Sequence, residues 1–111
     1  MSLRQDRISE QIRDIIGGCF LGGKLEDPRL QGVSITFVKI SPDLQVCTVY
    51  FRLYSDEFSE AQVVAGLNSA AGFFRKLLAK QLGLRRVPNL RFFFDENIER
   101  ASRIEELLNQ I

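Results

Sequence analysis

Two runs of alternating apolar and polar residues meet at a short turn near the middle of the chain. The runs are VSITFVKI, residues 33–40, and QVCTVYFRLY, residues 45–54, and the turn between them reads SPDL. Branched and aromatic residues on both sides of a Pro-Asp turn are typical of strands, and so short a connection makes them antiparallel. The chain must therefore build a sheet around a β-hairpin.

Helical spacing of apolar residues predicts the elements on either side of this hairpin. Residues 3–20 predict an amphipathic helix, and residues 21–32 a polar loop containing Gly and Pro. Residues 59–82 repeat the helical spacing after three possible caps, Ser55, Asp56 and Ser59. A third strand is predicted at 90–95 and a last helix at 96–111. This order predicts a single α+β domain over residues 1–111, with a three-stranded sheet and helices packed on one face.

Three small residues, Ala70, Ala71 and Gly72, lie inside the long helical segment. A straight helix over 59–82 would span about 36 Å, which is longer than the predicted strands, and a glycine in a helix interior costs about 1 kcal/mol relative to alanine. A kink at this small-residue cluster would let both halves of the segment pack on one sheet, and a break between two helices there would open the first N–H groups of the second helix to an anion. The alternative is a straight helix whose glycine allows close packing.

Positive charge gathers in the second half of the chain. Residues 61–94 hold six bases and no acid, although the net charge of the whole chain is only +1. This local excess indicates an anionic partner, and an open helix start beside Arg75 and Lys76 favours the phosphate backbone of RNA. The alternative is a solvated helix face whose counter-charges come from elsewhere in the fold. The six bases are Arg75, Lys76, Lys80, Arg85, Arg86 and Arg91.

The absence of histidine argues against an enzyme, because histidine is the commonest general base and metal ligand. No nucleophile elbow, P-loop or metal-ligand spacing occurs, so we expect no cofactor, no metal and no small-molecule substrate. Asp43 in the SPDL turn is more typical of a side chain that bonds its own backbone than of a catalytic carboxylate. Cys19 and Cys47 lie in apolar stretches and are predicted to be reduced core residues. No run is apolar enough to span a membrane, so a soluble, cytoplasmic protein is expected.

Several blocks of the sequence resemble the ribosome-binding factor A family in their order and spacing, over residues 4–108. They are RQDRI (4–8), DPRL (27–30), VKISPDL (38–44), VY (49–50), GFFR (72–75) and LRRVPNLRFFFD (84–95). The order of elements also resembles that of the type II KH domain, a nucleic-acid-binding fold. The GxxG loop of KH domains does not occur between residues 61 and 94, and AAG at 70–72 is similar to the A-x-G kink of the family instead.

The resemblance implies a factor that binds the immature 30S small ribosomal subunit at its 16S rRNA. Such a factor assists processing of the 5′ end of the rRNA and late maturation of the subunit, then dissociates, and matters most in the cold. The kink of the family carries over to Ala70 and Gly72, and its basic surface to Arg4, Arg7, Arg75, Lys76, Lys80, Arg85, Arg86 and Arg91.

Within the block 84–95, Leu84 and Val87 are expected in the core, and Pro88 is expected to stiffen a turn. We expect a monomer. The alternative function is a protein-docking module of the same fold without direct RNA binding, which would use the sheet face or the region of Phe73 and Phe74.

Overall fold

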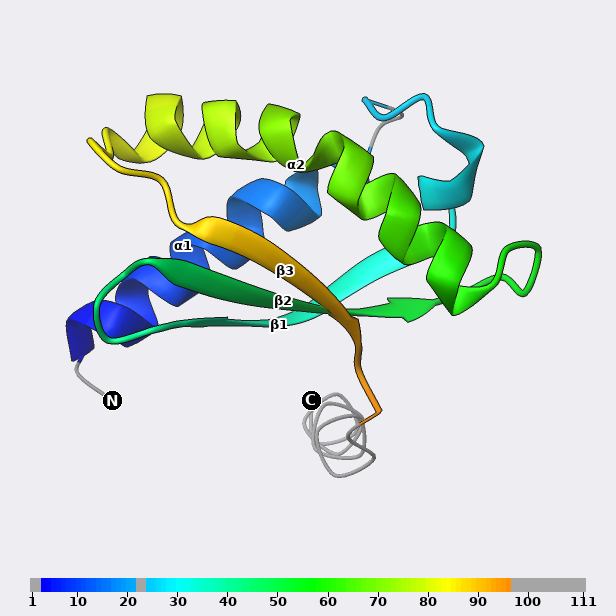
Figure 1. Cartoon of the computed structure of the whole chain (residues 1–111), viewed down its shortest axis with the longest axis horizontal. Coiled ribbons are helices and arrows are strands. Elements are labelled where there is room, and N and C mark those ends of the chain that lie inside the picture. Colours follow the sequence, from blue (N-terminus) through cyan, green and yellow to red (C-terminus); the bar gives the residue numbers. More distant parts are fainter. Residues whose placement is uncertain (1–2, 22–23, 97–111) are drawn as a thin grey trace, which may run out of the picture.

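The computed structural model describes residues 3–21 and 24–96, and it shows two helices lying on one face of a three-stranded sheet (Figure 1). This arrangement confirms the predicted α+β class. The predicted helix at 96–111 falls almost wholly on residues 97–111, outside the described residues, so it stays a prediction. The elements are α1 (Leu3–Gly18), a short 3₁₀ helix η1 (Pro28–Leu30), β1 (Val33–Ile40), β2 (Val46–Leu53), α2 (Glu60–Leu82) and β3 (Asn89–Phe94).

The sheet has the order β1-β2-β3, with the hairpin strands antiparallel and β3 parallel to β2. A parallel neighbour needs a crossover connection, and α2 supplies it. Asp95, directly after β3, is buried and ties the three strands together. Its carboxylate accepts a hydrogen bond from Thr36 Oγ1 on β1 at 2.6 Å, and its N–H donates to the carbonyl of Phe51 on β2 at 2.8 Å.

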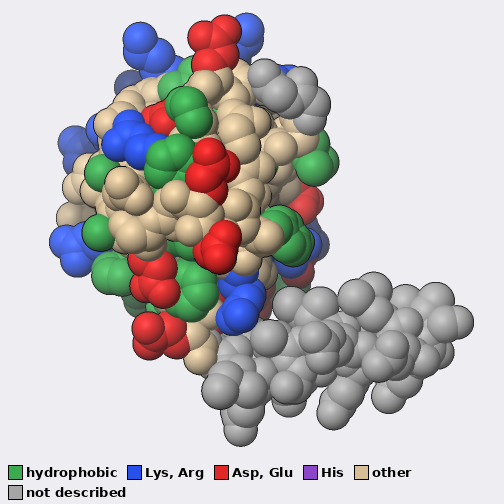
Figure 2. Space-filling model, turned by 90° about the vertical axis from the view of Figure 1, so that its right-hand side faces the viewer, with side chains coloured by type: hydrophobic (Ala, Val, Ile, Leu, Met, Phe, Trp, Pro, Cys, Tyr) green, Lys and Arg blue, Asp and Glu red, His purple; other side chains and the backbone are tan. Residues whose placement is uncertain are grey.

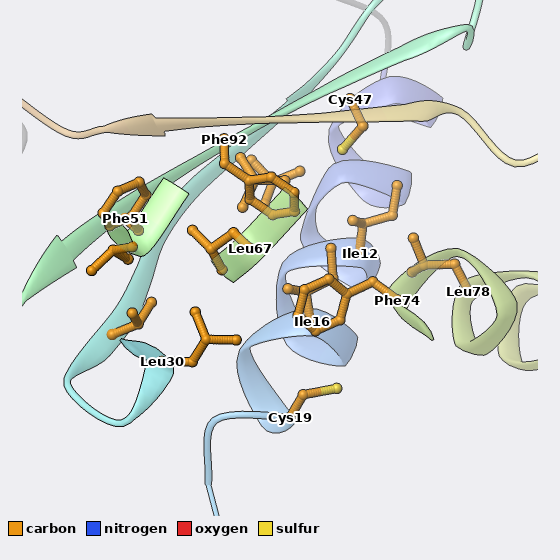
Figure 3. Close-up of a cluster of buried hydrophobic side chains, with 14 of the residues drawn as sticks. Ile12, Ile16, Cys19, Leu30, Cys47, Phe51, Leu67, Phe74, Leu78 and Phe92 are labelled. Atoms are coloured by element: carbon orange, nitrogen blue, oxygen red, sulfur yellow. The ribbon is translucent and has the colours of Figure 1, made fainter. Parts of the chain in front are cut away.

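The core lies between the sheet and the two helices. Figure 3 shows Ile12 and Ile16 of α1, Leu67 and Phe74 of α2, and Phe92 of β3 pointing toward one another. The ring centroid of Phe74 lies 6.0 Å from that of Phe20 and 6.1 Å from that of Phe92, so this one side chain links α2 to the sheet and to the turn that follows α1. Burying a side chain of this size stabilises the fold by about 1.5–3 kcal/mol.

Cys19 and Cys47 are buried and unpaired, as predicted. Burial disfavours the charged thiolate, and it raises the pKa of Cys47 to about 12. It also raises the pKa of Cys19, although the charge of Lys24 opposes that shift. Both thiols are therefore protonated at neutral pH and act as small apolar core groups.

The predicted division of the long helical segment into two helices is wrong. α2 runs without interruption from Glu60 to Leu82, so the N–H groups near Gly72 remain inside a continuous helix and do not form an open anion site. Figure 1 shows that α2 changes direction near its middle, so the predicted kink is present although the helix is not divided. This bend lets Leu67 in the first half and Phe74 and Leu78 in the second half all reach the core.

The glycine that permits close packing is Gly66, not Gly72. A Cβ added at Gly66 would lie 3.1 Å from Leu30 Cδ2 and 3.2 Å from Arg29 Nε, whereas a Cβ added at Gly72 would meet nothing within 4 Å. The alternative prediction, a straight helix packed closely at Gly72, is therefore also wrong. The side chains that crowd Gly66 come from η1, a loop whose position the periodicity of the helix does not reveal.

Candidate nucleic-acid interface

An open groove of about 1330 Å³ lies between the β1–β2 turn, the second half of α2 and the segment that leads into β3. These three segments are far apart in the sequence and meet at the left-hand end of the molecule in Figure 1. Four of the ten predicted site residues line it. We call this surface the basic groove, and its lining residues are Asp43, Leu44, Gln45, Arg75, Lys76, Leu84, Arg85, Arg86, Val87 and Asn89.

The periodicity of α2 places the first two bases. Phe74 and Leu78 are fully buried against the sheet, so Arg75 and Lys76 project to the exposed side of the helix. Gly83, with a φ of 62°, then ends the helix in the left-handed conformation that glycine adopts without strain. The chain turns back at this point, and Arg85 and Arg86 follow in the turned segment.

Hydrogen bonds hold the segment that carries Arg85 and Arg86. Arg75 Nη2 donates to the carbonyl of Val87 at 3.1 Å, and the N–H of Asn89 donates to the carbonyl of Gln45 at 2.9 Å. Pro88 is buried between Val87 and Asn89, whose backbone groups make these bonds, but the bend of the segment falls at Arg85 and Arg86 rather than at the proline. Leu84, expected in the core, is half-buried and lines the groove instead.

The bases of the groove have no ion-pair partner among residues 3–21 and 24–96. The two ion pairs in this part of the chain join Arg13 to Asp14 and Arg29 to Asp27, and both lie outside the groove. Asp43 also lines the groove but forms no ion pair with these four bases, so the groove keeps an excess of positive charge. Its positive charge remains available to an anionic ligand.

The other predicted site residues lie elsewhere. Arg4 and Arg7 are exposed on the first half of α1, which lies beside the end of β1, where the N–H of Ile40 donates to Ser9 Oγ at 3.2 Å. Lys80 is exposed on α2 but does not line the groove. Ala70 is half-buried against the core, and Gly72 is exposed.

Arg91 projects from the opposite face of the sheet. Successive side chains of a strand alternate between the two faces, and its neighbour Phe92 is buried against the helices. Arg91 and the half-exposed Phe93 therefore lie on the face that α1 and α2 do not cover. The predicted basic surface is thus divided between the groove, the first half of α1 and this second face.

Sequence reasoning missed the β1–β2 turn as a wall of the groove. It correctly assigned Asp43 to a turn that bonds its own backbone, since Asp43 Oδ1 accepts from the N–H of Gln45 at 3.1 Å. Ser41 Oγ also donates to Asp43 Oδ1 at 2.6 Å, and these hydrogen bonds lower the pKa of Asp43. The carboxylate is therefore firmly ionised at neutral pH. No periodic signal could show that this turn faces α2.

The other end of the molecule is acidic. Asp56, Glu57 and Glu60 are exposed on the loop before α2 and on its first turn. Figure 2 looks onto this end and shows several acidic side chains spread over the surface. The chain therefore carries a basic groove at one end and an acidic surface, which we call the acidic end, at the other.

The described part of the chain contains no group of three His, Cys, Asp or Glu side chains that could hold a metal ion. No helix in that part is both long and apolar enough to cross a membrane. The arrangement of the groove is suited to binding a polyanion by charge and hydrogen bonding.

Comparisons with known proteins agree over nearly the whole chain. A family model described as Ribosome-binding factor A matches residues 4–108. A Geobacter metallireducens protein named Ribosome-binding factor A is 40% identical over 111 residues, which cover 100% of this chain and 93% of the relative.

Two sets of coordinates for ribosome-binding factor A of Thermus thermophilus are also similar. The crystal structure of its ribosome-binding factor A has a TM-score of 0.72 at 26% identity and covers 81% of this chain and 93% of that one. A homology model of the ribosome binding factor A, fitted into the cryo-EM map of a 30S–RbfA complex, has a TM-score of 0.62 at 27% identity and covers 76% and 87%. These likenesses confirm the predicted KH-like fold. With the family model matched over residues 4–108, they show that this chain belongs to the ribosome-binding factor A family.

Proposed function

We propose that this chain binds the immature 30S small ribosomal subunit at its 16S rRNA, assists processing of the 5′ end of the rRNA and late maturation, and then dissociates. The single observation that carries the proposal is the basic groove, in which four bases converge without an ion-pair partner in the described part of the chain. A related protein of Thermus thermophilus has been fitted into the map of a 30S complex, which supports the same partner here. The chain acts in the cytoplasm as a monomer and as a binding factor rather than an enzyme, and it matters most in the cold.

The groove holds the RNA backbone by charge. Arg75 and Lys76 on one helix turn, and Arg85 and Arg86 on the segment beside it, present cations along one wall. Phosphates displace condensed counterions when they meet such cations, so binding weakens as salt rises. Four phosphate contacts to a single strand give a log–log slope of affinity against salt of about −3.

Sedimentation with immature and mature 30S particles at two or more salt concentrations tests this proposal. We expect co-sedimentation that favours immature particles and weakens steeply with salt. The variant Lys76→Gln/Arg86→Gln removes two groove charges whose side chains make no hydrogen bond within the described residues, so its slope should be shallower by about 1.4.

The matched control is Arg13→Gln/Lys24→Gln, which removes the same charge outside the groove. This control should bind like the wild type. If the groove variant and the control lose the same amount of binding, the basic groove is not the RNA site.

A protein-docking function has one observation in its favour. Phe73 is 48% exposed on α2, although its neighbour Phe74 is completely buried. Docking through such an apolar side chain would depend little on salt and strongly on Phe73. A flat salt profile together with loss of binding in Phe73→Ala would therefore favour this alternative over RNA binding.

A further inference from the structure

The two walls of the basic groove differ in their chemistry. The wall formed by α2 and the following segment carries the four bases. The facing wall, formed by the β1–β2 turn and the first residue of β3, carries one carboxylate, one aliphatic side chain and two amides instead. These residues are Asp43, Leu44, Gln45 and Asn89. A strand whose phosphates lie along the first wall would turn its bases toward the second.

The facing wall is rigid. The N–H of Leu44 donates to the carbonyl of Ser41 at 2.9 Å, and the N–H of Val46 donates to Ser41 Oγ at 3.0 Å. The N–H of Asn89 joins the turn to β3 through the carbonyl of Gln45. These bonds fix the backbone of the wall before any ligand arrives.

Leu44 adopts a conformation that leucine rarely takes. Its φ is 61°, and among residues 3–21 and 24–96 it is the only non-glycine residue with a positive φ. Such backbone strain costs about 1 kcal/mol or more and is maintained only where the surroundings enforce it. The side chain of Leu44 packs against the core while also lining the groove. The packing of Leu44 therefore maintains a strained backbone conformation in the turn.

One carboxylate oxygen of Asp43, Oδ2, takes no part in the hydrogen bonds of the turn. Oδ1 accepts the hydrogen bonds from Ser41 Oγ and from the N–H of Gln45, which fix the orientation of the whole carboxylate. Oδ2 accepts no hydrogen bond from another residue in the described part of the chain. An ionised carboxylate only accepts hydrogen bonds, so any group that binds at Oδ2 must be a donor.

We propose that Asp43 Oδ2 recognises the exocyclic amino group of an RNA base whose phosphates lie on Arg75, Lys76, Arg85 and Arg86. This inference rests on the proposed RNA-binding function and assigns base selectivity to the β1–β2 turn. Cytosine offers its N4 amino group as a donor, whereas uracil presents the O4 acceptor at the same position. The carboxylate attracts the first and repels the second, so the groove selects cytosine over uracil.

A different role for Asp43 has a different signature. A carboxylate that only closes the turn, or only reduces the positive potential of the groove, affects all RNA sequences equally because phosphates carry no sequence information. A carboxylate that recognises a base changes the ratio of affinities for two bases. Cytosine and uracil are the appropriate pair, since they have the same ring size.

The test measures binding of the full chain to octacytidylate and octauridylate at fixed salt. A hydrogen bond to a charged group contributes about 1.5–3 kcal/mol, so the wild type should prefer octacytidylate by at least about tenfold. In Asp43→Asn the amide oxygen can still accept from Ser41 and Gln45, and the turn should hold. Its NH₂ group donates to uracil O4, so the preference should disappear or reverse.

Asp56→Asn is the matched control, because it removes one carboxylate at the acidic end. It should keep the cytosine preference of the wild type. Asp43→Glu is a second variant that keeps the charge but moves the carboxylate by one methylene, and it should also lose most of the preference. Melting curves of each variant confirm that the fold is retained.

Equal affinity of the wild type for the two oligonucleotides would overturn the inference. The inference would also be overturned if the preference for octacytidylate survived both substitutions of Asp43. An equal increase in affinity for both oligonucleotides in Asp43→Asn would overturn it as well. In those cases salt-dependent binding that is weakened by Lys76→Gln/Arg86→Gln would leave the proposed function intact. If neither oligonucleotide bound and 30S co-sedimentation were also insensitive to salt and to that variant, the proposed function itself would fail.

Discussion

Gly66 and Gly72 both lie within α2 but have opposite surroundings. Gly66 is buried beneath η1, where a Cβ atom would lie only 3.1–3.3 Å from the side chains of Leu30, Arg29 and Asp27. Gly72 is exposed, and nothing lies within 4 Å of the position that its Cβ would take. The two glycines therefore have the same intrinsic cost in a helix, but only at Gly66 would an added Cβ crowd neighbouring side chains.

We predict opposite effects of alanine at these two positions. Gly72→Ala should raise the free energy of unfolding by about 1 kcal/mol, since alanine is the better helix former and meets no obstacle. Gly66→Ala gains the same propensity but must displace the buried Leu30 and the Asp27–Arg29 pair, so we expect a net loss. Urea denaturation of the two variants measures both effects. Destabilisation by Gly72→Ala would show that the bend of α2 depends on glycine.

At the scale of elements, α2 determines how the sheet and the groove are connected. Ser59 caps its start by accepting from the N–H of Gln62 at 3.2 Å, and Gln62 Oε1 accepts from the N–H of Ser59 at 2.8 Å. Gly83 ends it. Between these two ends the helix buries apolar residues on one side and presents Arg75 and Lys76 on the other. The boundaries of α2 therefore also set the position of the groove.

Removing the N-cap tests how much the start of α2 contributes. Ser59→Ala loses the hydrogen bond that Ser59 Oγ accepts from the N–H of Gln62, although the backbone N–H of residue 59 can still donate to Gln62 Oε1. The variant should lower the free energy of unfolding by about 1 kcal/mol. Ser69→Ala is the matched control, because Ser69 lies inside α2 and its hydroxyl only bonds back to the carbonyl of Ala65. The control should be neutral or slightly stabilising. Chemical denaturation compares the two, and equal effects would argue against a specific role of the cap.

At the scale of the whole molecule, positive and negative side chains gather at opposite ends. The net charge is only +1, but the basic groove and the acidic end occupy opposite ends of a molecule that measures 37 × 35 × 23 Å. Salt at 0.15 M screens charges beyond about 8 Å. An RNA strand in the groove therefore interacts with the local bases and hardly with the acids at the far end.

This separation predicts that local charge, and not net charge, governs RNA binding. Asp56→Asn/Glu57→Gln makes the chain more basic by two charges at the acidic end, yet at 0.15 M salt it should change the affinity for 30S particles by less than about twofold because of screening. Lys76→Gln/Arg86→Gln changes the net charge by the same amount in the other direction and should weaken binding strongly. Parallel titrations compare the two variants. Effects of equal size and opposite sign would mean that non-specific attraction dominates.

Periodicity predicted the elements well. The alternating runs became β1 and β2, the helical spacing of the isoleucines became α1, and LRFFFD became β3 with a shift of one residue. Ser59 was among the three predicted caps, and the structure selects it. The bend of α2 agrees with the predicted kink, but the expected open start of a second helix at Gly72 does not form, because α2 continues through this residue. The glycine whose missing Cβ allows close packing is Gly66, which lies against η1, a segment distant in sequence.

The candidate site was predicted only in part. The local excess of bases indicated Arg75, Lys76, Arg85 and Arg86 correctly as neighbours, because α2 and its following turn are continuous in sequence. Arg91 was grouped with them but projects from the other face, since strand alternation reverses its direction relative to Phe92. Asp43 and Gln45 come from a segment some thirty residues earlier, and only the pairing of the strands brings them to the groove.

The chain alone therefore specifies its local elements, its fold class and its family, because side-chain period, turn residues and motif order are properties of consecutive residues. The tertiary structure decides which elements face one another. It makes one bent helix of the segment at Gly72, places the β1–β2 turn opposite the bases, and divides the positive charge between two faces of the sheet. These outcomes depend on packing between residues that are distant in sequence. The pattern of consecutive residues does not predict such contacts.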